Sequence, residues 1–291
     1  MLKFNDPTTE IIRQRFSCRD YSREPVKAWK REQLQAYIEA LPPGPFGTRP
    51  RFDLLAATEM DSKSLRGLGT YGFIKNPSAF IVGAMSPAEY DLEDFGYLME
   101  SIILVATSLD LGTCWLGGTF TKSRFAKKIN LSTNETMPAV TSLGEYTVSG
   151  QKRQGVASRT AGSDRRLPWE TLFTEYTLDN PLSQSEAAEY ATALEMVRVG
   201  PSASNKQPWR ILKHNQFWRF YLQRTPGYRR DLIKRILDLC DLQRLDMGIA
   251  MCHFELTAKE LGLGGKWVME DEFDKTPDEL TEYIVSWENL Y

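Results

Sequence analysis

Two basic residues and a hydroxyl group near the N-terminus could bind an anion. Arg15, Ser17 and Arg19 alternate along the chain, so in an extended segment all three side chains would point to one side. Guanidinium groups arranged in this way can hold a phosphate by forked hydrogen bonds. A further basic cluster, residues 165–168 (Arg-Arg-Leu-Pro), occurs later in the chain. A solvated helix end is the more common origin of an Arg-x-Ser-x-Arg pattern, so spacing alone leaves both interpretations open.

A second set of polar groups lies in residues 200–210, which read GPSASNKQPWR. Ser202, Asn205 and Gln207 supply neutral hydrogen-bond donors and acceptors. Such groups suit hydroxyls or the edge of a heterocycle rather than a full negative charge. The segment follows a helical pattern over residues 187–199, and an elaborate helix ending is the alternative interpretation.

Two long helices are expected at the centre of the molecule, because one stretch of the sequence recurs. Residues 94–115 align without gaps with residues 246–267 at a constant shift of 152, and nine of the twenty-two positions are identical. Ordinary composition would give roughly one or two identities by chance. Each copy predicts a largely apolar helix that ends at Leu-x-Leu-Gly, where the glycine provides a left-handed cap, followed by a strand near the tryptophan. We therefore expect two pseudo-symmetric halves.

The polar loop has a counterpart in the first half that lacks its polar groups. At a shift of 158, residues 201–209 lie opposite residues 43–51, which keep the prolines. Ser202, Ser204, Asn205 and Gln207 are replaced there by Gly44, Phe46, Gly47 and Arg49. The basic pattern, conversely, occurs only in the first half. This complementary loss predicts a single ligand site built from both halves.

The remaining elements indicate the α+β class. We expect helices over residues 8–17, 29–41 and 183–199, and strands over residues 52–58, 78–83, 138–146, 210–213 and 282–287. These elements do not alternate as regular βαβ units, which favours α+β over α/β. The polar residues 149–164 predict a linker or an extended loop. The expected halves are residues 1–178, with the arginines and a Gly-Gly strand end, and residues 179–291, with the polar loop.

Composition and charge exclude several classes of function. The formal net charge of the 291 residues is -2, so no global positive field favours nucleic acid or an anionic membrane. Four cysteines without CxxC spacing and two histidines give no metal-ligand cluster. No segment is apolar over the ~20 residues of a spanning helix, and the N-terminus does not read as a signal peptide. A cytoplasmic protein is expected.

Residues 67–72 match G-x-G-x-x-G, the dinucleotide-binding fingerprint. That motif needs a strand before the glycines and a helix after them. Here an apolar, strand-like run, residues 78–83, follows the glycines. The match therefore predicts a loop.

Four motifs together resemble those of the FMN-dependent nitroreductases. They are residues 15–19 (RFSCR) followed by Tyr21 and Pro25-Val26, residues 109–118 (LDLGTCWLGG), residues 166–168 (RLP) and residues 201–209 (PSASNKQPW). The resemblance spans almost the whole chain, and the last motif is the most specific. Ordinary members are homodimers with two flavins at the interface, each held by arginines of one subunit and the Pro-Ser loop of the other. The resemblance implies a nitroreductase-like fold in which one chain forms a fused dimer with one surviving site, as in a single-chain, TM nitroreductase-like subgroup.

The resemblance also implies roles for individual residues. The FMN phosphate and ribityl chain would be held by Arg15, Ser17, Arg19 and Arg166. The flavin would be contacted from the second half by Pro201, Ser202 and Asn205, with Gln207 orienting the loop. Gly117 and Gly118 would present backbone groups to flavin N5 and the pyrimidine edge. Two departures are Asp164, where many members have a lysine, and Val268-Met269, which stand in place of Leu-Gly-Gly in the second half.

The implied activity is hydride transfer from NAD(P)H through FMN to a small electron-poor acceptor, such as a nitroaromatic or a quinone, by a ping-pong mechanism. No side chain is nominated as a catalytic acid, base or metal ligand. A catalytically silent FMN-binding protein for storage or sensing, or a degenerate scaffold without flavin, are the alternatives. Because the dimer is fused, we expect a monomer, with neither a nucleic acid nor a membrane as partner.

Overall fold

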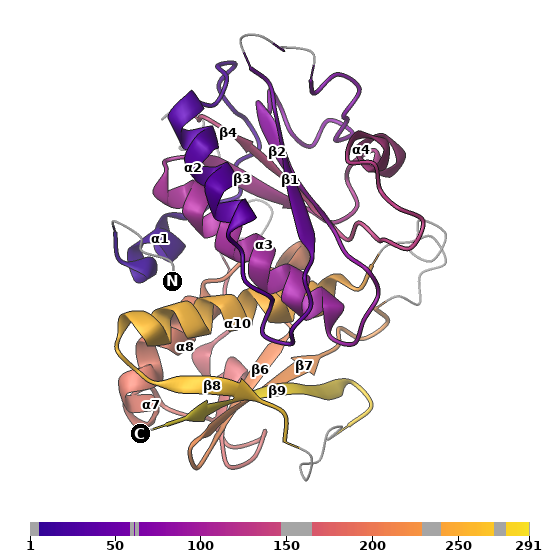
Figure 1. The fold of residues 1–291 in the computed structure, drawn as a ribbon. Coiled ribbons are helices and arrows are strands. Elements are labelled where there is room, and N and C mark those ends of the chain that lie inside the picture. Colours follow the sequence, from indigo (N-terminus) through magenta and orange to yellow (C-terminus); the bar gives the residue numbers. More distant parts are fainter. Residues whose placement is uncertain are drawn as a thin grey trace.

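Two long helices cross at the centre of the computed structural model, which describes residues 6–58, 61, 64–146, 165–228, 240–270 and 278–290. These helices are α3 (Asp91–Ser108) and α10 (Leu242–Glu260) (Figure 1). A Cβ added to Gly96 would lie 2.2 Å from the carbonyl oxygen of Leu245, and a Cβ added to Gly248 would lie 2.0 Å from that of Glu93. The two contacts are related by the shift of 152 found in the sequence.

The first sheet contains β1 (Arg51–Ala56), β2 (Ala79–Ala84), β4 (Val140–Gly144) and β3 (Gly112–Leu116), in that spatial order. All neighbouring strands are antiparallel. Side chains alternate between its faces. Ile81 packs with α2 (Ala28–Glu39) and α3 on one face, whereas Phe80 and Val82 pack with α4 (Lys122–Lys128) on the other.

The second sheet repeats this order. It contains β6 (Trp209–His214), β7 (Phe217–Gln223), β9 (Thr281–Asn289) and β8 (Gly265–Val268), with antiparallel neighbours. One strand has no counterpart in the first sheet as described: β5 (Phe173–Glu175) lies parallel to β6 at the sheet edge. It lies within the expected first half, residues 1–178, yet pairs with β6, so the chain crosses over before residue 178 and completes the sheet of the second half.

The shorter helices surround α3 and α10. They are α1 (Thr8–Gln14), α6 (Trp169–Leu172), α7 (Gln184–Ala187), the 3-10 turn η1 (Ala188–Tyr190), α8 (Ala191–Arg198) and the 3-10 turn η2 (Ala203–Asn205). Ile11 and Ile12 of α1 pack against Met196 of α8 and Cys252 of α10. The N-terminal helix therefore bridges to the second half.

The α+β class is confirmed, as are the long helices and the expected strands. The single helix expected over residues 183–199 is wrong, because a capping box of Ser183 and Glu186 starts α7 and Ala188 then adopts φ 49°. The break precedes Tyr190, whose ring is buried in the aromatic core of the second half. Strand β7 was not expected, since it is buried on both faces and gives no simple alternation.

Residues 67–72 form a loop between β1 and β2, as expected, and not a strand-to-helix turn. The predicted linker, residues 149–164, lies outside the described residues. The boundary after residue 178 stays a prediction. Within the described ranges, no helix has both the length and the apolar character needed to span a bilayer.

Candidate functional site

The N-terminal basic segment lies along the edge of the first sheet. Helix α1 ends at Gln14, and Arg15 has extended backbone angles (φ -59°, ψ 130°). Ser17 forms a parallel bridge with Thr113 of β3, and the N–H of Cys18 donates to the carbonyl oxygen of Thr113 at 2.7 Å. The Cys18 side chain is fully buried in the core. The segment is thus fixed as an extra strand-like edge beside β3.

Arg15, Ser17 and Arg19 all lie near the thiol of Cys114. Burial raises the pKa of this thiol, while the positive charges of Arg19 and Arg15 and a side-chain hydrogen bond with Ser17 act in the opposite direction. Because the segment pairs with β3 through Ser17 and Cys18, its extended backbone directs the alternating side chains of Arg15, Ser17 and Arg19 to one side.

The guanidinium group of Arg15 is almost buried and faces a carboxylate. Its Nε lies 3.7 Å from Oε1 of Glu100 in α3, and its side chain is 7% exposed. This Nε has no hydrogen-bond partner among the described residues. A buried donor without a partner is costly, so Arg15 is suited to a further acceptor such as a phosphate oxygen.

The polar loop, residues 201–207, is held in a strained form. Ser204, Asn205 and Gln207 have φ values of 51°, 53° and 48°, a region that non-glycine residues rarely adopt. The hydroxyl of Ser202 accepts a hydrogen bond from the N–H of Gln207 at 2.9 Å. Such strain persists only where the surroundings fix the backbone, and it is common at ligand sites.

A buried carboxylate on α10 anchors this loop. The N–H of Ala203 lies 2.9 and 3.1 Å from the two carboxylate oxygens of Asp246. Burial raises the pKa of Asp246, and the bond from Ala203 opposes this effect. The start of the loop is thereby tied to the second turn of α10.

Residues 165–172, which lead into β5 and which we call the crossover segment, pack against the same loop. The guanidinium of Arg166 donates to Oδ1 of Asn205 at 2.6 Å and to the carbonyl oxygen of Val199 at 2.8 Å. The amide of Asn205 donates to the carbonyl of Arg165 at 2.8 Å, and the side-chain oxygen of Gln207 accepts from the N–H of Leu167 at 2.8 Å. Arg166 therefore lies with the loop of the second half, although it falls within the expected first half, residues 1–178.

Gly117 and Gly118 follow β3 and lie beside the start of α10. A Cβ added to Gly117 would lie 2.6 Å from a methyl carbon of Leu242. Leu242 and Asp246 are four residues apart and share one face of α10, separated by about 6 Å along the axis. The Gly-Gly turn and the polar loop thus approach the same stretch of α10. Gly117 is required for this packing, whereas Gly118 is exposed.

A buried hydrogen-bond network joins the two halves next to these elements. Glu100 accepts from Nε1 of Trp115 at 2.7 Å, and its Oε1 lies 3.0 Å from Nε2 of His253 in α10. The Nδ1 of His253 lies 2.9 Å from the carbonyl oxygen of Met196 in α8. Both ring nitrogens of His253 therefore lie within hydrogen-bond distance of a partner. Burial raises the pKa of Glu100, but His253 and Arg15 bring it below its ordinary value.

Sequence reasoning missed Glu100 and His253 as site residues. Both are fully buried. The available signal was a charged or polar residue inside an apolar helical run, since Glu is rarely buried without a partner. Their contact with each other could not be read from the sequence, because it joins the two halves.

The corresponding loop of the first half is anchored in the same way but presents an aromatic ring. Asp94 accepts from the N–H groups of Phe46 and Thr48 at 2.9 and 2.8 Å, and it precedes Asp246 by the same shift of 152. The ring of Phe46 stacks on Tyr90 with centroids 4.5 Å apart and packs against the core of the second half. Phe46 thus makes an apolar contact at the position that Ser204 occupies in the other loop.

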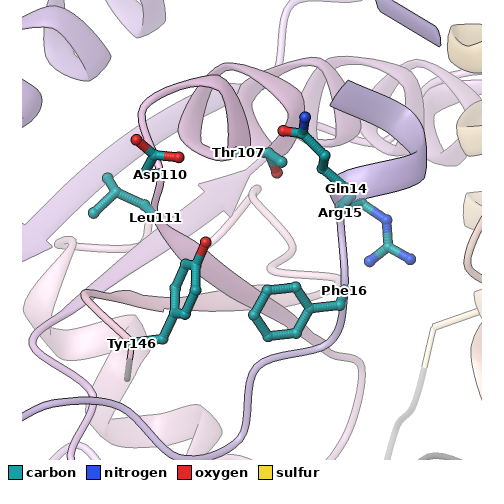
Figure 2. A pocket seen from close by; sticks show the side chains of 7 residues that line it. All are labelled: Gln14, Arg15, Phe16, Thr107, Asp110, Leu111 and Tyr146. Atoms are coloured by element: carbon teal, nitrogen blue, oxygen red, sulfur yellow. The ribbon is translucent and has the colours of Figure 1, made fainter. Parts of the chain in front are cut away.

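A cavity of about 270 Å³ lies on the other side of the N-terminal segment. Its lining residues are Gln14, Arg15, Phe16, Thr107, Asp110, Leu111 and Tyr146. Figure 2 shows that the guanidinium of Arg15 points away from it. The cavity is therefore separate from the groups assembled near α10. In the ranges that the structure describes, no three His, Cys, Asp or Glu residues form a metal site.

Comparison with known proteins gives one family and several solved structures. The model of the family described as "Putative TM nitroreductase" matches residues 7–258. A "putative nitroreductase" from Thermotoga maritima is 17% identical, with a TM-score of 0.61 over 99% of this chain and 96% of its own. It therefore shares the fold along the whole chain.

Smaller solved structures match about half of the chain. A nitroreductase with bound FMN from Bacteroides fragilis is 20% identical, with a TM-score of 0.38 over 49% of this chain and 90% of its own. An FMN-dependent nitroreductase from Clostridium difficile is 18% identical, with a TM-score of 0.37 over 47% of this chain and 86% of its own. No curated protein matches the chain.

Proposed function

The chain belongs to the "Putative TM nitroreductase" family, and from this membership we propose that it is an FMN-dependent oxidoreductase. The observation that supports the proposal is that two complementary sets of groups are both connected to helix α10. The loop of residues 201–207 lies against α10 and the crossover segment, and the cationic segment approaches the same helix through Glu100 and His253.

The residues present fit the chemistry of FMN. Arg15 has a buried donor that lacks a partner among the described residues, and Ser17 and Arg19 follow at alternate positions of the same extended segment. These groups suit a phosphate, which accepts charge-assisted hydrogen bonds. The neutral groups of Ser202 and Asn205 suit the ribityl hydroxyls and the ring edge.

When bound, FMN would supply the redox chemistry, taking a hydride from NAD(P)H and passing it to a small electron-poor acceptor such as a nitroaromatic or a quinone. The chain itself would bind and orient the cofactor. Arg15, Arg19 and Arg166 provide positive charge that stabilises an anion in a partly buried setting. The strained loop holds its donors before ligand arrives, so less ordering is needed on binding. No proton-transfer residue is assigned.

We also propose one site per chain and a monomer. Phe46 in the first loop provides no polar group, and the second half has Val268 and Met269 after its tryptophan. The second potential site therefore lacks both the basic residues and the donors of the first.

The experiment that tests the function is a visible spectrum of the purified protein, with the released flavin counted per chain, followed by NAD(P)H oxidation with a quinone. We expect about one FMN per chain and acceptor-dependent turnover. Bound FMN with no oxidation of either nicotinamide would contradict the enzymatic proposal. A chain that takes up no FMN, even when it is added in excess, would contradict the cofactor proposal.

A further inference from the structure

One buried carboxylate contacts Arg15 and two further residues that lie close in the chain or in space to proposed flavin-binding residues. Glu100 lies in the middle of α3 and is fully buried. Its two oxygens face Arg15 at 3.7 Å, Trp115 at 2.7 Å and His253 at 3.0 Å. These three residues come from the N-terminal segment, from β3 and from α10.

Each contact leads directly to a different part of the site. Arg15 is itself the first residue of the basic pattern. Trp115 lies in β3, two residues before Gly117. His253 continues to the carbonyl oxygen of Met196 in α8, and a Cβ added to Gly200 would lie 3.2 Å from its Nδ1. Gly200 immediately precedes the polar loop.

We propose that Glu100 is a positioning residue that sets the geometry of the flavin site from both halves at once. The inference rests on the proposed FMN function. Glu100 does not itself contact the cofactor in this proposal; it acts through Arg15, Trp115 and His253.

The physical reason is the different flexibility of the groups that it joins. An arginine side chain has many rotamers, and its phosphate contact depends on the orientation of its planar fork. The buried Glu100 carboxylate is fixed in place by its hydrogen bonds with the Trp115 indole and the His253 imidazole. Its negative charge therefore favours one orientation of the Arg15 guanidinium. Buried groups that must be satisfied together act as a unit.

Glu100 acts on the site through two contacts, one with Arg15 and one with His253, which we call the two arms of the network. Disrupting each arm should change the affinities for FMN and riboflavin differently. The arm through Arg15 reaches the phosphate, which FMN has and riboflavin lacks. The arm through His253 reaches the loop, which contacts the parts that both flavins share. The ratio of FMN to riboflavin affinity therefore separates the arms, whereas general loosening of the fold would change both affinities together.

The test is titration of the full-length protein, stripped of flavin, with FMN and with riboflavin, followed by flavin fluorescence. Glu100→Gln keeps the side-chain shape and removes the charge. We expect its preference for FMN over riboflavin to fall about tenfold. For His253→Gln, we expect both affinities to weaken with the preference retained. Glu100→Asp keeps the charge but shortens the side chain, so the preference of this variant for FMN over riboflavin should fall less than that of Glu100→Gln. If Glu100→Gln does not fold, Glu100→Asp is the test variant.

The matched control is Glu93→Gln. Glu93 is also a fully buried carboxylate of α3, ion-paired across the helix crossing with Arg244 at 2.6 Å, but none of its hydrogen bonds leads to the basic segment. We expect it to lower the melting temperature and leave the preference unchanged. If the wild type prefers FMN and both Glu100 variants keep that preference within about twofold, the positioning role is wrong. If the wild type binds neither flavin, the proposed function fails as well.

Discussion

Gly96 and Gly248 occupy equivalent places where α3 and α10 cross, and each lies against a backbone carbonyl of the other helix. A Cβ on Gly96 would be 2.2 Å from the oxygen of Leu245, and one on Gly248 would be 2.0 Å from that of Glu93. The helices are therefore in backbone contact. A methyl group at either place cannot be accommodated by a side-chain rotation.

Alanine at either glycine should destabilise the protein. In an exposed helix, Gly→Ala gains about 1 kcal/mol from helix propensity. Here overpacking against backbone should outweigh that gain, and we expect a net loss of about 1–3 kcal/mol for each variant. Urea unfolding monitored by circular dichroism measures it. A stabilised Gly248→Ala protein would show that the helices can separate freely.

Asp246 and Asp94 provide a matched pair for the two loops. Asp246→Ala removes the anchor of Ala203, so we expect FMN affinity to fall about tenfold through loss of the loop geometry. Asp94→Ala removes the equivalent anchor of Phe46 and Thr48 and should lower stability without changing FMN affinity. Equal effects of the two variants on FMN binding would mean that both loops serve a ligand.

The composite site predicts sensitivity in both halves. Arg19→Ala removes a charge from the N-terminal segment, and Asn205→Asp places a negative charge beside the loop backbone. Each should weaken FMN binding by about tenfold, as judged from the loss of one charge-assisted or polar contact. Fluorescence titration checks this. Sensitivity of only one half would show that the halves do not share the site.

Lowering the pH should remove the stabilisation that the ion pair between Arg51 of β1 and Glu135 contributes. The guanidinium of Arg51 bonds both oxygens of Glu135 at 2.8 Å and lowers the pKa of Glu135 to about 2. Because the folded pKa is depressed, the stabilisation is present above the ordinary pKa of Glu and is lost as pH falls from there through about 2. Glu135→Gln should therefore show a smaller loss of melting temperature between pH 6 and about 2.5 than wild type. Arg51→Gln should behave alike; unchanged pH dependence in both would contradict the shift.

The fused arrangement predicts a monomer. The two sheets and the crossing helices α3 and α10 belong to one chain, so no second copy of the chain is needed to form the contact between the halves. Light scattering at several protein concentrations should give the mass of one chain, 33.3 kDa. A larger assembly that persists on dilution would contradict this.

The sequence predicted more of the fold than of the site. Repetition around Gly96 and Gly248 identified the central helices, because close helix packing preserves small residues and apolar spacing in both copies. The alternating arginines and the polar loop were found because they occur in only one copy each. The strand β7 and the break at Ala188 were missed, since tertiary burial overrides local pattern there.

Long-range contacts limited the prediction of the site. The position of Arg166 beside Asn205 depends on a crossover that no local spacing reveals. Glu100 and His253, which contact each other, lie 153 residues apart in the chain. Side-chain networks of this kind become visible only when both halves are placed in space.

The crossover that leads into β5 makes the two halves a single covalent unit, and this changes how they can diverge. In an assembly of identical subunits, any substitution is present in every copy, so a loop cannot lose its polar groups on one side alone. In a single chain, the two loops are different stretches of one sequence, so a substitution in one leaves the other unchanged. One loop can therefore carry Phe46, which packs against the core of the second half, while the other carries Ser204 at the corresponding position.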